Sequence, residues 1–146
     1  MKLEGKYRFQ APRQRVWQIL NDPTVIAKHL PGCESLERTG EDAYDAVLSI
    51  GVGAIKGAYQ ARLEIVNKQP GRGYTLRVAG SGKPGHVKGE GQVRLSGDGE
   101  ITELEYEGDL QIGGLIARVG QRIIGTVSRQ MAARFFEGLG HEAETA

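Results

Sequence analysis

The single cysteine of the chain lies in the stretch LPGCESLE, residues 30–37, directly after a proline and a glycine. A nucleophilic cysteine needs a base or a positively charged neighbour that favours the thiolate, and the nearest candidates are His29 and Arg38. A histidine four residues away across a proline–glycine break is weak support for a catalytic pair. Because a free cysteine commonly packs as a small apolar side chain, we interpret Cys33 as a packing residue and retain a redox or metal contact as the alternative.

The other side chains with catalytic potential are scattered along the chain. Glu137, His86 and His29 are the best candidates for an acid or base in a small cyclase or hydrolase, which we keep as an alternative function. The three histidines do not have the spacing of metal ligands, so we predict no metal site. Our first interpretation is therefore a protein that is not an enzyme and has no catalytic residues.

Four tyrosines are the polar side chains on a face that is otherwise apolar. Tyr44, Tyr59, Tyr74 and Tyr106 each occupy an inward position in a run of alternating residues, because side chains i and i+2 of a strand share one face. The inward positions of these runs contain no Asp, Glu, His, Lys or Arg. Such a face suits an apolar ligand held by a few hydrogen bonds, although ordinary core packing explains each tyrosine taken singly.

Strands and short helices must position these side chains. Alternation predicts a first strand in KLEGKYRF and six further strands between residue 34 and about residue 112, separated by turn sequences such as KQPGRG and SGDGE. Between the first two strands, Pro12 and Pro23 suit the first turns of two short helices, and Pro31 prevents continuation of the second.

A helical pattern follows the strands and runs to about Leu139, with Ile116, Val119, Ile123, Val127 and Met131 on one apolar side. A one-sided antiparallel sheet needs a cover for its apolar face, and only this helix is long enough. The sequence therefore predicts an α+β fold in which a curved, seven-stranded antiparallel sheet surrounds a long C-terminal helix. Residues 1–142 form a single domain in this interpretation, and residues 143–146 form a C-terminal tail.

Composition limits the partners. The 19 Lys and Arg against 18 Asp and Glu give a formal net charge of +1, which argues against nucleic acid, since that binding depends on neutralising phosphates. A single cysteine forms no internal disulfide, and the start MKLEGKYRFQ lacks the apolar core of a signal peptide. No run approaches the roughly 18 apolar residues of a membrane-spanning helix. We expect a cytoplasmic protein, with peripheral contact at the inner face of the membrane left open.

The order of elements resembles the helix-grip fold of the SRPBCC, or START-like, superfamily. More narrowly, APRQRVWQILNDP, LPGCESLE, IGVGAIKGAY, KGEGQVRL, LQIGGLIARVGQRII and FFE resemble the CoxG family of carbon monoxide dehydrogenase proteins over nearly the full length. The resemblance implies a non-catalytic accessory protein of a molybdenum-containing carbon monoxide dehydrogenase or related hydroxylase. It also implies a hydrophobic cavity and a link to the membrane or the quinone pool, with no cofactor apart from a bound quinone or lipid.

The predicted cavity lies between the inward side chains of the sheet and the apolar side of the long helix. Its predicted lining is Tyr44, Leu48, Tyr59, Leu63, Tyr74, Leu76, Gly89, Gly91, Tyr106, Leu110, Val119, Ile123 and Val127. The two glycines either leave room on a concave face or allow their strand to curve.

Two turns are predicted to form the mouth of this cavity. Leu30, Pro31 and Cys33 join the second short helix to the second strand, and Val52 and Ile55 belong to the hairpin tip IGVGAIKGAY. This tip is not a phosphate-binding loop, because it lacks the spacing and the Lys-Ser/Thr at a helix start. An ordinary hairpin is the alternative to a mobile entrance flap.

A basic stripe follows the long helix. No acidic residue occurs from Leu110 to Phe136, whereas Arg118, Arg122 and Arg129 lie there. A solvated face is the ordinary explanation, and the functional one is an attachment face for anionic lipid or for an acidic partner enzyme. Many family members continue into a membrane-associating tail, but only GHEAETA follows the last apolar position of this helix, so direct anchoring is not expected.

Overall fold

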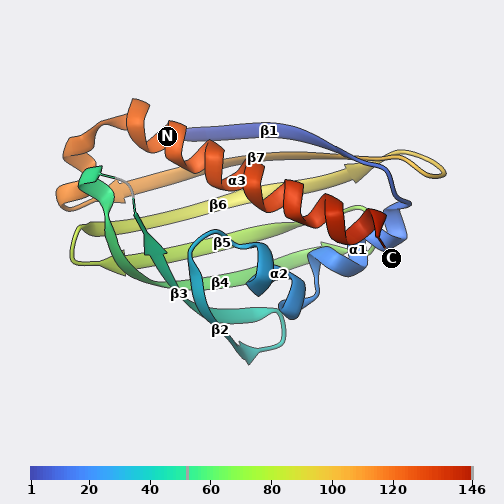
Figure 1. Ribbon diagram of the computed structural model, residues 1–146, viewed down its shortest axis with the longest axis horizontal. Coiled ribbons are helices and arrows are strands. Elements are labelled where there is room, and N and C mark those ends of the chain that lie inside the picture. Colours follow the sequence, from blue (N-terminus) through green and yellow to red (C-terminus); the bar gives the residue numbers. More distant parts are fainter. Residues whose placement is uncertain (52, 146) are drawn as a thin grey trace.

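The fold is one antiparallel sheet with helices on a single face, seen in a computed structural model that describes residues 1–51 and 53–145, without the side chain of Ala54. The strands are β1 (Lys2–Phe9), β2 (Cys33–Gly40), β3 (Ala43–Ile50), β4 (Gly57–Gln69), β5 (Gly73–Gly82), β6 (Gly85–Ser96) and β7 (Thr102–Gly113). Their order across the seven-stranded sheet is β1-β7-β6-β5-β4-β3-β2. Figure 1 shows the curved sheet with the long C-terminal helix lying across it, which confirms the predicted fold class.

Short helices connect the strands. They are α1 (Arg13–Leu20), α2 (Pro23–His29), and the 3-10 helices η1 (Gly53–Ile55) and η2 (Leu115–Val119). The start of α2 is well specified, because the Asp22 side chain accepts a hydrogen bond of 2.9 Å from the Thr24 amide and Pro23 occupies the first turn. The two predicted helices between β1 and β2 are therefore confirmed.

The long helix begins later than predicted. Residues Leu115–Val119 form η2, Gly120 adopts a φ of 97°, and α3 runs from Gln121 to Glu144. A positive φ is readily adopted by glycine and interrupts helical geometry, so α3 starts anew at Gln121 and Ile123 falls in its first turn. Ile124 is consequently buried at 8% exposure while Ile123 is 50% exposed. The prediction that Ile123 belongs to the apolar, sheet-facing side was wrong for this reason.

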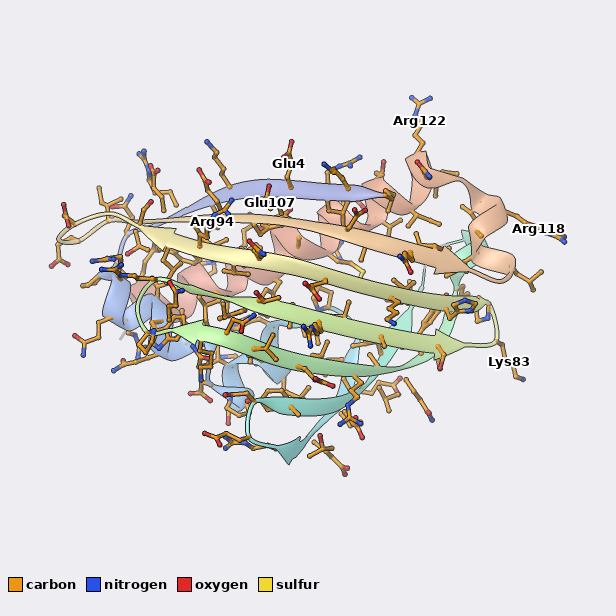
Figure 2. All side chains as sticks on the ribbon, turned by 180° about the vertical axis from the view of Figure 1, so that it is seen from behind. Glu4, Lys83, Arg94, Glu107, Arg118 and Arg122 are labelled. Carbon is orange, nitrogen blue, oxygen red and sulfur yellow. The ribbon has the colours of Figure 1, made fainter. Side chains whose placement is uncertain are left out.

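The two faces of the sheet differ as the alternation predicted. Tyr44 lies opposite Leu63, Leu63 opposite Val78, and Val78 opposite Gly89, so these positions share the face toward α3, the inner face. On the outer face, pairs such as Arg94–Glu107 (3.3 Å) and Arg77–Glu90 (3.0 Å) join neighbouring strands. Figure 2 shows Glu4, Arg94 and Glu107 on this outer face. Exposed ion pairs contribute little stability, so the outer face is a solvated surface.

The core fills one end of the inner face. Phe9, Leu20, Leu104 and Leu139 are almost completely buried there. Gly140 of α3 approaches β1 closely, because a Cβ at this position would lie 3.6 Å from the ring of Tyr7. The second half of α3 is therefore packed tightly against β1, α1 and the ends of β6 and β7.

The rest of the inner face is less completely covered. Several of its apolar side chains are only half buried, and they are Leu48, Leu63, Leu76, Val78 and Leu110. The backbone of α3 approaches chiefly β1, α1, α2 and η2 rather than the middle strands that carry most of these residues. An apolar surface next to the first half of α3 is thus left partly uncovered.

Candidate ligand-binding site

The strand residues predicted to line a cavity come together on the inner face. In the paired strands, Tyr59 lies opposite Leu48, and Leu76 lies opposite both Ile65 and Gly91. From the helical side, Val127 is buried and Val119 is half buried. These positions make an apolar surface in which the tyrosine hydroxyls are the polar groups of interest.

Tyr59 uses its hydroxyl inside the protein. The phenol donates a hydrogen bond of 2.6 Å to the carbonyl oxygen of Ile55. This bond ties η1 to β4 and leaves the hydroxyl with no free proton for a ligand carbonyl. The predicted lining residue Tyr59 is therefore better described as a support for the hairpin tip.

Tyr44 and Tyr74 are different, because neither hydroxyl has a hydrogen-bond partner among the described residues. Tyr44 is 2% exposed, and Tyr74 packs its ring on Trp17 with centroids 5.9 Å apart. The atoms that are fully enclosed without a partner, within the described part of the chain, are Arg15 Nε and Asn21 Oδ1. The two tyrosine hydroxyls are not among these atoms, although Tyr44 is almost completely buried.

The environment of Tyr74 keeps its hydroxyl protonated. Burial raises the pKa of Tyr74, and the proximity of Tyr44 raises the same pKa further. A phenol that carries its proton is a hydrogen-bond donor, and the hydroxyl of Tyr44 lies on the same apolar face. We call these two residues the tyrosine pair.

Tyr106 lies over β1. A Cβ at Gly5 would be 2.6 Å from its hydroxyl oxygen, so the ring occupies the space that a side chain at Gly5 would need. Burial raises the pKa of Tyr106, and the nearby guanidinium of Arg129 lowers it in part. The exposed Arg129 therefore lies close to this phenol, on the side of α3 that faces β1.

The glycines of β6 serve close packing. A Cβ at Gly89 would lie 2.5 Å from a methyl group of Leu110 and 3.3 Å from one of Val78. At Gly91 the neighbours are backbone atoms of β7, with the Glu107 carbonyl oxygen 3.1 Å from the same position. The space expected above Gly89 is thus filled by neighbouring side chains, which favours the alternative that these glycines allow the strands to curve.

The predicted mouth lies where α2 meets β2. Leu30, Pro31 and Cys33 are half buried, and Cys33 pairs with Leu48 of the inner face. The thiol of Cys33 donates to the carbonyl of Ser35 over 3.3 Å, and burial raises its pKa. A raised pKa disfavours the thiolate, in agreement with a packing role.

The hairpin tip is the other part of the predicted mouth. Ile55 of η1 is half buried, its carbonyl oxygen accepts the hydrogen bond from Tyr59, and η1 lies close to η2. Val52, the remaining predicted mouth residue, lies outside the described residues.

The candidate acids and bases are not on the inner face. Glu137 and His86 are exposed. His29 Nε2 lies 3.0 Å from Glu142 Oε1, and Lys28 Nζ lies 2.7 Å from the same oxygen. These hydrogen bonds from Lys28 and His29 lower the pKa of Glu142 to about 2 and join α2 to α3. The inner-face positions of β3, β5, β6 and β7, and of β4 up to Ile65, all described, carry no Asp, Glu, His, Lys or Arg. Beyond the bulge of β4, Lys68 Nζ lies 6.0 Å from the centroid of the Trp17 ring.

Metal and membrane criteria give two further findings. Within residues 1–51 and 53–145, no three His, Cys, Asp or Glu side chains are grouped as a metal site requires. None of the helices in that part of the chain combines the length and the hydropathy needed to span a bilayer.

One end of the molecule combines exposed apolar and basic side chains. Leu115 and Ile123 are 62% and 50% exposed, and Arg118, Arg122 and Lys83 are exposed beside them. Figure 2 shows these three basic side chains projecting from the same end. Residues 46–63, 78–89 and 110–136, which build this end and continue into α3, contain no Asp or Glu. We call these five residues the basic tip. The basic charge of Arg118 and Arg122 was predicted from the sequence, whereas the exposure of Ile123 was not.

Two cavities lie at the other end of the sheet, beside α1. Their volumes are about 440 and 400 Å³, and both are lined by Arg13 and Arg72. Neither contains a residue predicted to line the ligand cavity. Sequence reasoning missed these cavities, because three separate segments of the chain form them and no motif spacing connects those segments.

Comparisons with known proteins agree with this geometry. The family model for CoxG, a component of carbon monoxide dehydrogenase, matches residues 5–144. No curated protein matches the sequence. A crystal structure of a conserved protein from Geobacillus kaustophilus is 36% identical, with a TM-score of 0.95 and coverage of 99% of this chain and 95% of that one.

More distant structures share the fold alone. A Zhui aromatase/cyclase from a Streptomyces species is 19% identical, with a TM-score of 0.73 and coverage of 99% of this chain and 93% of that one. A START superfamily protein from Mycobacterium smegmatis is 9% identical, with a TM-score of 0.72 over 98% of this chain and 97% of that one.

Proposed function

The chain belongs to the CoxG family of carbon monoxide dehydrogenase proteins, and from that premise we propose that it is a non-catalytic accessory protein that binds an apolar molecule bearing a carbonyl group. The molecule, a quinone or a lipid-like compound, binds between the inner face and α3. The protein serves a molybdenum-containing carbon monoxide dehydrogenase or a related hydroxylase.

The observation that carries the proposal is the tyrosine pair on a half-buried apolar face. Leu48, Leu63 and Leu110 supply apolar surface, and burying ligand hydrocarbon on it contributes about 25 cal/mol per Å². The hydroxyls of Tyr44 and Tyr74 are donors without partners among the described residues, so they suit a ligand carbonyl oxygen. Affinity then comes mainly from the apolar surface and orientation from the two donors.

The first experiment is native mass spectrometry of protein purified from its own host, followed by organic extraction of released molecules. A quinone or lipid in near-stoichiometric amount supports the proposal, as does its loss from a Tyr44→Phe/Tyr74→Phe variant. Tyr59→Phe is the matched control, because its hydroxyl is already bonded to Ile55. An empty protein that also takes up no added quinone or lipid contradicts the proposal and favours a recruitment protein without a ligand.

The alternative of a small cyclase or hydrolase has a precedent in the fold, since one structural neighbour is an aromatase/cyclase. The inner face gives it no support, because β3, β4 up to Ile65, and β5 to β7 present no ionisable acid or base there apart from phenols. Glu137 and His86 are exposed, and His29 is bonded to Glu142.

We further propose that the basic tip is where the protein touches an anionic membrane. Leu115 and Ile123 supply apolar side chains for the lipid interface, and Arg118, Arg122 and Lys83 supply charge attraction. In a flotation assay with phosphatidylglycerol vesicles, Arg118→Glu/Arg122→Glu is expected to lose binding. The control Arg77→Glu changes a cation on the outer face and should retain it. Equal binding by both variants contradicts this part of the proposal.

A further inference from the structure

The two cavities beside α1 share Arg13 and Arg72, and we call them together the α1 pocket. The start of α1, the β4–β5 turn and the end of β6 with its following turn line it. Figure 1 shows these two turns and α1 at the same end of the sheet, away from η1 and η2. The α1 pocket therefore lies away from the basic tip and borders the inner-face site, because its lining residue Trp17 packs on Tyr74.

The charges that face the α1 pocket are unequally matched. Arg94 is 3.3 Å from Glu107, and Asp98 is the acidic side chain of the lining. Arg13 and Arg72, which line both cavities, form no ion pair or side-chain hydrogen bond within the described part of the chain. Asp98 forms an ion pair with neither arginine within the described part of the chain, so an anion bound between Arg13 and Arg72 would offset their mutual repulsion.

The backbone holds Arg72 firmly in this position. Its amide donates to the Gln69 carbonyl over 2.8 Å, and its own carbonyl accepts from the Leu95 amide over 2.7 Å. These bonds fix the β4–β5 turn to β6, so the Arg72 side chain starts from a rigid point. Arg13 starts from the first turn of α1. A fixed backbone limits the positions that the two guanidinium groups can reach, which lowers the entropy lost when they bind an oxyanion.

The walls of the α1 pocket add further recognition groups. Gln69 and Ser96 contribute an amide and a hydroxyl, which donate hydrogen bonds to oxygen. Trp17 and Leu95 contribute apolar surface, and the ring of Trp17 packs against that of Tyr74 with the two planes tilted by 55°. An oxyanion carried on a small organic body fits this combination, with the anion at the arginines and the body against the indole.

We infer that the α1 pocket binds the phosphate group of a small organic molecule through Arg13 and Arg72. Guanidinium groups match phosphate oxygens with paired hydrogen bonds, and two of them neutralise a doubly charged phosphate. The cavity is shallow and open to solvent, so a ligand bound at the arginines stays partly hydrated. The inference does not rest on the proposed carriage of an apolar molecule, because Arg13 and Arg72 do not belong to the inner-face site.

The test uses the fluorescence of Trp17, which is the only tryptophan in the chain. Phenyl phosphate, inorganic phosphate and benzoate are titrated separately at constant ionic strength, set with sodium chloride. The expected result is a saturable change in Trp17 fluorescence with phenyl phosphate. Inorganic phosphate should bind more weakly because it lacks the ring, and benzoate should bind more weakly because it carries one charge. Arg13→Gln and Arg72→Gln each weaken phenyl phosphate binding roughly tenfold or more, since each removes charge-assisted hydrogen bonds.

Arg77→Gln is the matched control, because it removes an arginine of β5 that is paired with Glu90 on the outer face. This variant should bind phenyl phosphate as the unchanged protein does. A response that persists in the Arg13→Gln/Arg72→Gln variant, with an unchanged circular dichroism spectrum, overturns the inference. A change in Trp17 fluorescence that sodium chloride alone reproduces also overturns it. Equal affinity for phenyl phosphate and inorganic phosphate refutes the part of the inference that places an organic group against the indole. Quinone uptake, measured on the same variants, should remain normal and so separates this site from the inner face.

Discussion

Replacing the tyrosine pair by phenylalanine separates ligand recognition from protein stability. Tyr44→Phe and Tyr74→Phe each remove a hydroxyl that has no hydrogen-bond partner among the described residues. No intramolecular bond is lost, so the free energy of unfolding of the ligand-free protein should change by no more than about 0.5 kcal/mol. The ring of Tyr74 stays on Trp17 because phenylalanine retains the stacking surface.

Binding of a quinone should respond differently. A neutral hydrogen bond contributes about 0.5–1.5 kcal/mol, so each substitution is expected to weaken quinone binding about 2- to 13-fold. A hydrocarbon analogue without carbonyl oxygens should bind both variants as it binds the unchanged protein. Tyr59→Phe reverses the pattern, because it breaks the 2.6 Å bond to Ile55 and should cost about 1 kcal/mol of stability with a smaller effect on quinone affinity.

Urea denaturation of the ligand-free proteins and calorimetric titration with a short-chain quinone and its hydrocarbon analogue measure both quantities. The reasoning is refuted if Tyr44→Phe and Tyr74→Phe destabilise the free protein as much as Tyr59→Phe does. It is equally refuted if quinone affinity is unchanged in both, because the two donors then contribute nothing to recognition.

Three further predictions concern packing and pH. Ile124→Ala should lower the free energy of unfolding, measured by urea denaturation, by about 2–3 kcal/mol, because Ile124 is buried. Ile123→Ala should lower it by no more than about 0.5 kcal/mol, because Ile123 is exposed. Equal losses in the two variants would contradict the assigned orientation of α3. Gly5→Ala should cost about 1–3 kcal/mol because the new methyl meets the ring of Tyr106, and a smaller residue at position 106 should recover part of this loss. In the folded state the pKa of Glu142 is lowered from 4.5 to about 2. The ionised Glu142 therefore stabilises the protein above pH 4.5, and this stabilisation is lost as the pH falls toward 2. The urea denaturation midpoint of the Glu142→Gln variant should lack this part of the pH dependence.

The sheet and its inner face were predictable because alternation is a local property. Tyr44, Leu63 and Val78 were assigned to one face from sequence positions alone, and the strand register puts them side by side. A strand repeats every two residues along its whole length, so a short run determines the face of every member. The same reasoning identified the acid-free inner positions.

The helix was less predictable because its phase depends on continuity. A helical wheel started at Ile116 fails at Ile123, in the first turn of α3 after Gly120, whereas Val127 further along is buried as the wheel predicts. Glycine within an apolar helical pattern was the available signal, although a glycine is also tolerated within helices. Gly125, which does lie inside α3, illustrates that ambiguity.

Hydrogen-bond partners and pockets could not be predicted from the sequence. Tyr59 and Tyr44 have the same sequence pattern, yet only the hydroxyl of Tyr59 meets a carbonyl, because η1 folds back toward β4. Arg13 and Arg72 meet through the packing of α1 beside the β4–β5 turn. Such contacts depend on how distant segments are placed, and no local period encodes that placement.

The pairing of the first strand with the last affects how the chain can be made. Lys2 of β1 pairs with Asp109 of β7, and α3, which covers both, follows later still. During synthesis β1 therefore emerges from the ribosome long before its partner exists, and its backbone groups stay unpaired in the sheet until β7 has been translated. Contacts between such distant segments slow folding. Until β7 and α3 have emerged, the nascent protein holds an incomplete, apolar sheet. During this interval it is most exposed to aggregation and to chaperones.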